Sequence, residues 1–427
     1  MTDSKTDTTI YDRRESEVRS YCRAFDTSFV SASGSIMKDA QGREYIDFLA
    51  GCSSLNYGHN DADMKAALVD YITGDGITHG LDMFTQAKEA FLETFERTVL
   101  APRGMEHKLM MVGPTGTNAV EAALKLARKV TGRSNVVAFT NGFHGMTLGA
   151  LALTGNAGKR GGSGVPLHNV THLPFEGSAG DLDTLAFARQ MLTNSSSGID
   201  APAAFILEVV QGEGGLNAAS AAWVQGIAKL AKELGALLII DDIQAGIGRT
   251  GGFFSFDDMG VEPDMVTMAK SLSGMGLPFA ALLLRPEHDI WSPAEHNGTF
   301  RGNNHAFVTA RVALEKFWSD DKFAAEVAEK ADILENRLAG IAALIDGAHL
   351  KGRGMMRGVD VGSGALAGRI CAEAFANGLI IETSGAEDEV VKVLAPLTTP
   401  VALFEAGLDT LEAAVQTTVK QTQIAAE

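Results

Sequence analysis

The chain has 427 residues, more than one hydrophobic core usually holds, so its length predicts a two-domain protein. Its 45% hydrophobic and 21% charged residues are ordinary for a globular protein, and no apolar run approaches the roughly 20 residues of a membrane span. A formal net charge of −17 argues against a nucleic-acid-binding surface. Three cysteines without paired spacing (Cys22, Cys52 and Cys371) predict neither a disulfide framework nor a metal site.

The N-terminal part predicts a polar tail, a helix and a hairpin. Residues 1–10 are polar and lack the basic start and apolar stretch of a signal peptide, so we expect a disordered tail and a cytoplasmic protein. A helix is predicted over residues 15–25. Alternating apolar and polar residues over 33–51, around a turn at 39–42, predict a β-hairpin.

The middle of the chain alternates short apolar runs with amphipathic segments of helical length. Helices are predicted over 119–130 and 222–234, and strands over 136–139, 204–210, 236–240, 265–268 and 280–284. Such alternation is typical of an α/β fold with a buried, mainly parallel sheet.

The C-terminal part predicts an α+β arrangement that packs with the N-terminal hairpin. Helices are expected over 305–317 and 322–344, a strand over 355–361, another helix, and a last strand over 390–394. We therefore expect a large domain of residues 56–305 and a smaller domain built from residues 1–55 and 306–427.

A glycine-rich turn, residues 113–117, precedes a strong helical segment. Free backbone N–H groups at a helix start, here at Gly116 and Thr117, are suited to bind a phosphate, and Thr117 adds a hydroxyl. An ordinary capped helix start is the alternative. The segment contains neither a G-x-G-x-x-G motif nor a Walker lysine.

Two carboxylates, Asp241 and Asp242, end a predicted buried strand and precede Ile243 and Gln244. An Asp in such a place needs a cationic partner, and a protonated pyridine nitrogen would be one. Helix capping or metal binding is the alternative, although no neighbouring His or third carboxylate in the sequence supports a metal.

Lys270 ends another predicted buried strand. Burial disfavours the charged form of a lysine and lowers its pKa, as Schiff-base chemistry requires. A surface lysine at a strand end is the alternative.

Two further strand ends carry candidate residues. Phe143 could stack on a planar cofactor or simply pack, and His144 follows it. Glu208 and Glu213 leave another strand among glycines, where a solvated turn is the alternative.

Taken together and in this order, these segments resemble the class III aminotransferases, a subgroup of the fold-type I pyridoxal-phosphate enzymes. The matching segments are GTNAVEAALKLAR, NGFHG, VVQGEGG, LLIIDDIQAGIGRTG, DMVTMAK and NGTFRGNN, and the resemblance extends from about Glu15 onward. It implies pyridoxal 5'-phosphate (PLP) as the cofactor and a seven-stranded large domain.

The resemblance also implies a role for each strand-end residue. Lys270 would form the Schiff base with PLP, Asp241 would keep the pyridine nitrogen protonated, and Gln244 would lie near the ring hydroxyl. Phe143 and Ile243 would enclose the ring. His144 and Glu208 would belong to the same cofactor site.

The implied phosphate site spans two subunits. The backbone of Gly116 and Thr117 would bind the phosphate together with Thr299 of the neighbouring subunit, so a homodimer is expected.

Other segments resemble the subgroup that forms 2,4-diaminobutyrate in ectoine synthesis: ESEVRSYCRAF, LNYGHN, ITHGLDMFTQAKEAFLETF, KRGGSGVPL and EHNGTFRGNNHAFVTA. This resemblance implies that glutamate gives its amine to aspartate β-semialdehyde. Enzymes of the class acting on ornithine, acetylornithine, 4-aminobutyrate or a simple amine, an aminomutase, and a non-catalytic scaffold are the alternatives.

Relatives bind the glutamate carboxylate with an arginine that otherwise pairs with a glutamate. Glu213 matches that glutamate, but Lys392 stands at the arginine's place and offers a point charge instead of a bidentate fork. Arg301 is therefore a further candidate for carboxylate binding, with a structural ion pair as the alternative.

Overall fold

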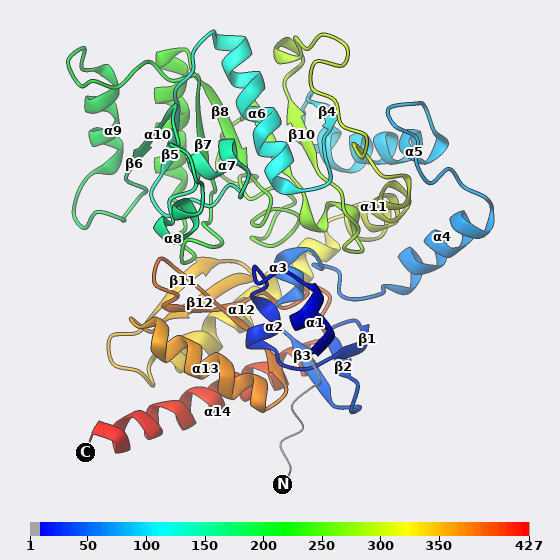
Figure 1. Ribbon diagram of the computed structural model, residues 1–427, viewed down its shortest axis with the longest axis vertical. Coiled ribbons are helices and arrows are strands. Elements are labelled where there is room, and N and C mark those ends of the chain that lie inside the picture. The colour runs from blue at the N-terminus through cyan, green and yellow to red at the C-terminus, as the bar shows by residue number, and fades with distance from the viewer. Residues whose placement is uncertain (1–8, 427) are drawn as a thin grey trace.

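The computed structural model describes residues 9–426 and contains a large, mainly parallel β-sheet (Figure 1). Among the described strands of this sheet, β10 alone runs in the opposite direction and pairs antiparallel with β4 and β9. The predicted α/β class with a large, mainly parallel sheet is thus confirmed. In spatial order the strands are β4 (Lys108–Met111), β10 (Ala281–Leu284), β9 (Met265–Met268), β8 (Leu237–Asp241), β7 (Ala204–Leu207), β5 (Val136–Phe139) and β6 (Val170–Leu173).

Helices cover both faces of this sheet because its strands are apolar on both sides. Alternate residues of a strand point to opposite faces. Val136 and Ala138 pack in the cluster that contains α6 (Gly116–Thr131), whereas Val137 and Phe139 pack in the cluster that contains α10 (Ala221–Leu234). The inner strands of the large sheet are therefore buried on both faces.

The two chain ends form the second part of the molecule, around two four-stranded sheets (Figure 1). β13 from the C-terminal part pairs in parallel with β3 from the N-terminal part, and Leu394 N donates to Phe48 O. One sheet consists of β1 (Phe29–Ser33), β2 (Ile36–Asp39), β3 (Glu44–Asp47) and β13 (Leu379–Ile380), and the other of β11 (His349–Arg353), β12 (Met356–Asp360), β15 (Val390–Val393) and β14 (Glu382–Ser384).

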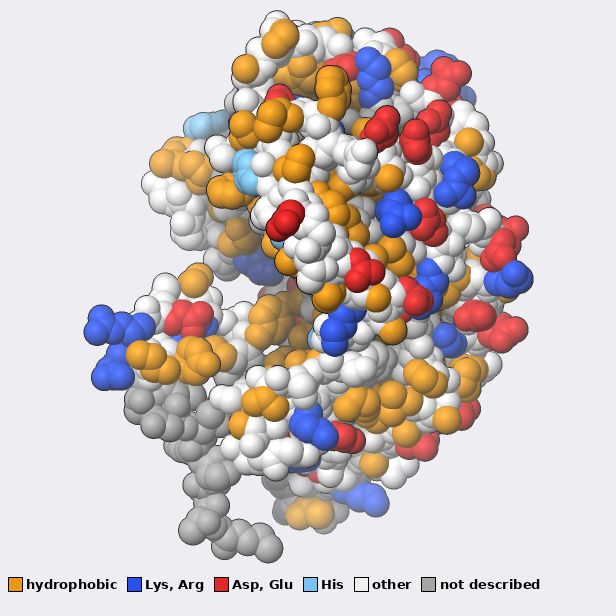
Figure 2. All heavy atoms as spheres, turned by 90° about the vertical axis from the view of Figure 1, so that its right-hand side faces the viewer, with side chains coloured by type: hydrophobic (Ala, Val, Ile, Leu, Met, Phe, Trp, Pro, Cys, Tyr) orange, Lys and Arg blue, Asp and Glu red, His pale blue; other side chains and the backbone are white. Residues whose placement is uncertain are grey.

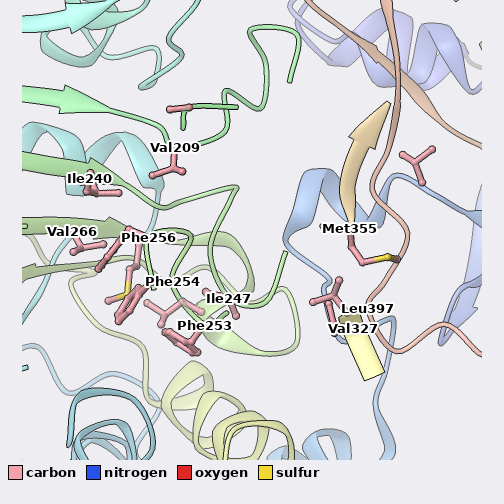
Figure 3. Close-up of a cluster of buried hydrophobic side chains, with 14 of the residues drawn as sticks. Val209, Ile240, Ile247, Phe253, Phe254, Phe256, Val266, Val327, Met355 and Leu397 are labelled. Atoms are coloured by element: carbon pink, nitrogen blue, oxygen red, sulfur yellow. The ribbon is translucent and has the colours of Figure 1, made fainter. Parts of the chain in front are cut away.

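One hydrophobic cluster extends from the large sheet to the C-terminal part (Figure 3). Ile240 and Val266 of the sheet belong to it, together with Met355, Val327 and Leu397. Phe253 lies in this cluster and contacts Phe254 edge-on, with ring centroids 5.0 Å apart. The two parts therefore share a continuous core.

None of the helices within residues 9–426 combines the length and apolar character that a membrane span requires. The other helices are α1 (Thr9–Arg14), α2 (Tyr21–Ala24), α3 (Ala50–Ser53), α4 (Ala62–Thr73), α5 (Gln86–Phe95), α7 (Leu148–Leu153), α8 (Ala157–Gly161), α9 (Thr184–Thr193), α11 (Asn304–Phe317), α12 (Lys322–Ala342), α13 (Gly364–Ala376) and α14 (Val401–Ala426), with short turns η1 (Glu96–Leu100), η2 (Ala101–Arg103), η3 (Lys270–Ser273) and η4 (Pro286–His288).

The predicted helix over residues 15–25 is too long, because only Tyr21–Ala24 (α2) of that range is helical. The chain bends between α1 and α2, where Arg19 Nε donates to Ser16 O and the Arg19 guanidinium pairs with Asp12. These side-chain contacts compete with helical hydrogen bonding. Most of the predicted disordered tail, residues 1–10, lies outside the described residues, and Thr9 and Ile10 begin α1. The domain boundaries at residues 55 and 305 stay predictions.

Candidate active site

A cavity of about 430 Å³ opens at the carboxyl ends of the parallel strands. Ligands of open α/β sheets bind at this edge. Four strands of the large sheet lead to it, because Phe143, Glu208, Asp241 and Lys270 follow or end β5, β7, β8 and β9. Its lining consists of Ser54, Pro114, Thr115, Gly116, Thr117, Phe143, His144, Gly145, Met146, Glu208, Glu213, Asp241, Ile243, Gln244, Ala269, Lys270, Gly276, Leu277, Pro278 and Phe279.

Asp241 is buried at the end of β8 and held from two sides. Its Oδ2 lies 2.7 Å from His144 Nδ1, and its Oδ1 accepts from Thr267 Oγ1 at 2.9 Å. Burial would lower the pKa of His144, but the hydrogen bond and charge of Asp241 outweigh it and raise that pKa. No histidine lies close to Asp241 in the sequence, and folding brings His144 there from another strand end.

Glu208 supports the loop that carries Phe143. Its two carboxylate oxygens accept from Phe143 N at 2.8 Å and from Gly212 N at 3.0 Å. Burial raises the pKa of Glu208 to about 7. Glu208 therefore fixes the wall of the cavity and joins two of the predicted strand-end segments.

Lys270 points into the cavity from η3, directly after β9. Burial lowers the pKa of its amine. Its φ of 50° lies in the left-handed region, which non-glycine residues seldom adopt and which is often found at functional sites. A lysine with a depressed pKa in a strained position is suited to act as a nucleophile.

The start of α6 forms another wall. Thr115 caps it, with its Oγ1 donating to Asn118 Oδ1 at 2.8 Å, and the first N–H groups of a helix have no partner within the helix. A Cβ on Gly116 would come within 2.9 Å of Ile243 Cδ1. Glycine at this position therefore keeps the space between the helix start and Ile243 open.

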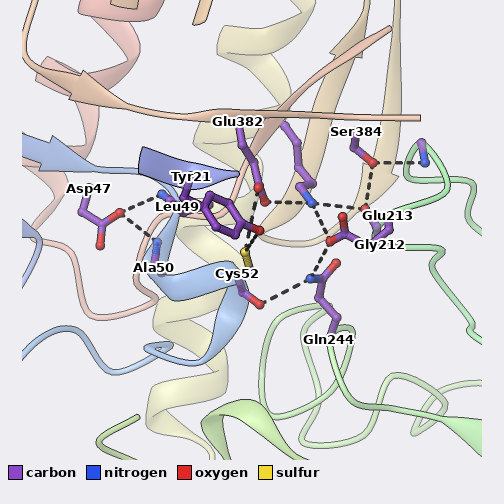
Figure 4. Close-up of polar contacts among 12 residues, drawn as sticks. Tyr21, Asp47, Leu49, Ala50, Cys52, Gly212, Glu213, Gln244, Glu382 and Ser384 are labelled. Carbon is purple, nitrogen blue, oxygen red and sulfur yellow. Dashed lines mark hydrogen bonds and ion pairs between the residues drawn. The ribbon is translucent and has the colours of Figure 1, made fainter. Parts of the chain in front are cut away.

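A chain of polar contacts leads away from the cavity through Gln244 (Figure 4). Gln244 Nε2 donates to Glu213 Oε1 at 3.1 Å, and Lys392 Nζ lies 3.1 Å from the same oxygen. Lys392 is fully buried and also pairs with Glu382 at 2.9 Å. Lys392 thus lies behind Glu213, not at the cavity wall.

Thr299 and Arg301 are not brought to this cavity within one chain. Thr299 is exposed, and Arg301 lines a separate hollow with Leu81, Phe84 and other residues. Arg301 Nη1 donates to Asn297 Oδ1 at 3.2 Å.

Sequence reasoning missed several residues that shape the site. Thr267 hydrogen-bonds Asp241, Glu382 pairs with Lys392, and Cys52 O accepts from Gln244. Thr267 had a signal, because it lies on β9, three residues before Lys270; the other two come from distant segments. Within residues 9–426, no group of three or more His, Cys, Asp or Glu side chains is arranged to hold a metal ion.

The geometry combines a nucleophilic lysine, a buried carboxylate and a helix start around one cavity. The family "Aminotransferase class-III" matches residues 21–415. The chain is 52% identical over 425 residues to the diaminobutyrate–2-oxoglutarate transaminase of Halalkalibacterium halodurans, covering 99% of both proteins. It is 54% identical over 411 residues to the protein so named from Halomonas elongata, covering 95% of this chain and 98% of that protein.

Solved structures show the same fold. The ornithine aminotransferase of Toxoplasma gondii superposes with a TM-score of 0.82 at 25% identity, covering 99% of this chain and 97% of that one. A transaminase from the marine bacterium Virgibacillus superposes with a TM-score of 0.87 at 17% identity, covering 97% and 99%. Sequence, fold and cavity agree, and the chain belongs to the class III aminotransferases.

Proposed function

We propose that the protein is a PLP-dependent transaminase that moves the amine of L-glutamate to L-aspartate 4-semialdehyde. The products are L-2,4-diaminobutyrate and 2-oxoglutarate, and the reaction is the first committed step of ectoine biosynthesis. Several relatives about 50% identical over nearly the full length carry the name diaminobutyrate–2-oxoglutarate transaminase. The observation that carries the reaction type is Lys270 facing the same cavity as the Asp241–His144 pair.

The cavity fits PLP on structural grounds. Gln244 Oε1 is a buried acceptor without a hydrogen-bond partner in the described chain. A ring hydroxyl of the cofactor would supply the missing donor. The N-terminus of α6 suits a phosphate, and Asp241 suits a protonated ring nitrogen.

When bound, PLP draws electrons from the substrate carbon that bears the amine and makes its proton acidic. Asp241 would keep the ring nitrogen protonated, because its carboxylate is fixed by Thr267 and His144. Lys270 would hold PLP covalently. Once displaced, its Nζ would move the proton, since burial favours the neutral amine that can accept it.

The remaining cofactor contacts come from the cavity wall. The backbone N–H groups of Gly116 and Thr117 would bind the phosphate, and Phe143 and Ile243 would enclose the ring. Gln244 would meet the ring hydroxyl.

The end of the substrate that does not react would contact Glu213 inside the cavity. Lys392 lies behind Glu213, so it could receive a substrate carboxylate only after Glu213 moves. Arg301 would serve the site of a neighbouring subunit.

We also propose a cytoplasmic homodimer in which Thr299 completes the partner's phosphate site. Exposure of Thr299 away from its own cavity supports this arrangement. On the side of α4 and α5, hydrophobic side chains gather at the surface (Figure 2), and Ile77, Met83 and Phe84 are exposed. Exposed apolar patches commonly mark protein interfaces.

A steady-state assay with glutamate and aspartate semialdehyde tests the proposed function through the release of 2-oxoglutarate. We expect turnover with this pair to exceed that with succinic semialdehyde or glutamate semialdehyde as acceptor. Preference for one of those acceptors would keep the reaction type and overturn the substrate.

A further inference from the structure

Lys392 is a single buried cation between two carboxylates. Its Nζ lies 3.1 Å from Glu213 Oε1 and 2.9 Å from Glu382 Oε1. Glu382 stands directly opposite Lys392 in the antiparallel pair of β14 and β15, so the contact follows from strand register. Burial alone would lower the pKa of Lys392, but the two carboxylates raise it, and the amine stays charged.

Glu213 lines the cavity and has one carboxylate oxygen with no hydrogen-bond partner among residues 9–426. Lys392 and Gln244 both contact Oε1, and no described residue hydrogen-bonds to Oε2. The Glu213 side chain is 25% exposed and lines the cavity. The Lys392 side chain is 0% exposed and is not part of the cavity lining. A substrate therefore meets a carboxylate oxygen here before it meets the lysine behind it.

The charges of this cluster do not cancel. One lysine faces two glutamates, which leaves one formal negative charge at the wall that Glu213 contributes. Among residues 9–426, Lys270 is the only lysine or arginine in the cavity lining. Lys270 is the further cation that acts on Glu213, and in the holoenzyme its amine would hold the cofactor. A partly buried carboxylate that shares Lys392 with a second carboxylate favours a cationic ligand group, with which it makes a charge-assisted hydrogen bond.

We propose that Glu382 makes the Glu213 wall selective for the second ammonium group of a diamino acid. Glu382 pairs with Lys392 and offsets its positive charge. Oε2 of Glu213 then stays available to an ammonium group of the substrate while the other amine reacts near Lys270. This inference rests on the proposed function and names the residues that set its donor specificity. Glu382 acts through Lys392 and Glu213 and is a positioning residue.

The contacts of Glu382 are consistent with this role. Its Oε2 lies 3.8 Å from Cys52 Sγ, and Cys52 Sγ lies 2.8 Å from Tyr21 Oη (Figure 4). Cys52 thus contacts Oε2 of Glu382, whereas Lys392 pairs with Oε1, and neither Cys52 nor Tyr21 supplies a positive charge. The extra negative charge of the cluster remains without a counter-ion among these neighbours.

The test is Glu382→Gln, which keeps the shape and removes one negative charge. The ligands are L-2,4-diaminobutyrate, 4-aminobutyrate, which differs only in lacking the second amine, and glutarate, which has two carboxylates and no amine. Dissociation constants are measured by calorimetry on holoenzyme reduced with borohydride, in which the cofactor is fixed and no turnover occurs. Glu387→Gln on the exposed loop after β14 is the matched control.

We expect the wild type and Glu387→Gln to prefer diaminobutyrate over 4-aminobutyrate by about tenfold or more. In Glu382→Gln this ratio should fall to about threefold or less, and glutarate should bind more tightly than to the wild type. Structural damage would instead weaken all three ligands together. That outcome, or an unchanged ratio, would overturn the inference.

If Glu382→Gln does not fold, Glu213→Gln tests the same charge balance, because it removes one formal negative charge from the same cluster and replaces a carboxylate oxygen with an amide nitrogen. An unchanged ratio in Glu213→Gln would also overturn the inference. Failure of the proposed function gives a different result: the unreduced wild-type enzyme would then not convert diaminobutyrate at all. Conversion of diaminobutyrate with an unaltered binding ratio in the variant would overturn only the inference.

Discussion

Asp241 is the residue whose surroundings are most completely determined. Three groups hold its carboxylate, namely His144 Nδ1, Thr267 Oγ1 and the backbone N–H of Ile243 at 3.3 Å. A carboxylate fixed in this way loses little freedom when it pairs with a cationic ring nitrogen, so its orientation is set before the ligand arrives.

Removing the negative charge of Asp241 should slow transamination without preventing PLP from binding. We expect Asp241→Asn to lower the single-turnover rate with diaminobutyrate by about two orders of magnitude or more, because the ring nitrogen loses its anionic partner. PLP should still bind through the start of α6. Stopped-flow absorbance measures the rate, and a rate equal to that of the wild type would contradict the assigned role.

Asp242 supplies a pH prediction. Burial raises its pKa to about 7 from an ordinary 3.8, although both of its oxygens accept from Ser255 N. The native state thus binds more protons than the unfolded state between these values, so this group costs stability as pH rises through that window. Relative to the wild type, Asp242→Asn should gain on the order of 2 kcal/mol of unfolding free energy between about pH 5 and about pH 8.

Urea denaturation of the holoenzyme at both pH values measures this difference. Asp258→Asn, at an exposed position nearby, is the control and should show none. A difference that stays constant or shrinks with pH would show that Asp242 is ionised in the native protein at low pH as well.

At the scale of elements, cofactor binding at the start of α6 should require glycine at position 116, which has no side chain. Gly116→Ala places a Cβ 2.9 Å from Ile243 Cδ1 and 3.2 Å from its Cγ2, so the Ile243 side chain, which lines the cavity, has to shift. We expect PLP affinity to fall by about tenfold, as for moderate overpacking, while alanine's helix preference preserves stability.

Titration of the apoprotein with PLP measures the affinity. Gly161→Ala, where a Cβ meets nothing within 4 Å, is the matched control and should bind as the wild type does. Equal affinity in Gly116→Ala would show that the space beside Ile243 is not needed.

The elements that the sequence predicted well are those with strong patterns. β5 and β9 have the predicted bounds, and α6 and α10 extend the predicted helices by a few residues at most. The edge strands β4 and β6 were missed because most of their residues are only partly buried, whereas the equally short β5 and β9 are buried throughout. Hydrophobic patterns identify strands buried on both faces far better than edge strands.

The site was predictable where it lies at strand ends and not elsewhere. Lys270, Asp241 and Phe143 follow apolar strands, so the parallel-sheet rule brought them together. Glu382 and Cys52 reach the site through β14, which has three residues, and through α3, where Cys52 has a φ of 55°. Neither segment has a pattern that places it beside a cavity built by the large sheet.

For the whole molecule, the dimer proposal makes a complementation test possible. If Thr299 serves the partner's site, Lys270→Ala and Thr299→Glu homodimers should both be inactive, the latter because a carboxylate repels the phosphate. Mixed dimers would then contain one site with both residues intact. Equal mixing by denaturation and refolding should restore about a quarter of the wild-type activity. No recovery in dimers shown to have exchanged subunits would place Thr299 in its own chain's site.

The most direct test of the central claim is the visible absorbance of the PLP-loaded protein after separate additions of L-2,4-diaminobutyrate, glutamate, ornithine and 4-aminobutyrate. Lys270 faces the cavity beside the buried Asp241, so we predict that the spectrum of the bound cofactor converts fastest to its amine-bearing form with diaminobutyrate and glutamate. Lys270→Ala should show no turnover, although it keeps its fold by circular dichroism. Substantial turnover in that variant, or wild-type protein that gives no spectral change with any donor, would contradict the account.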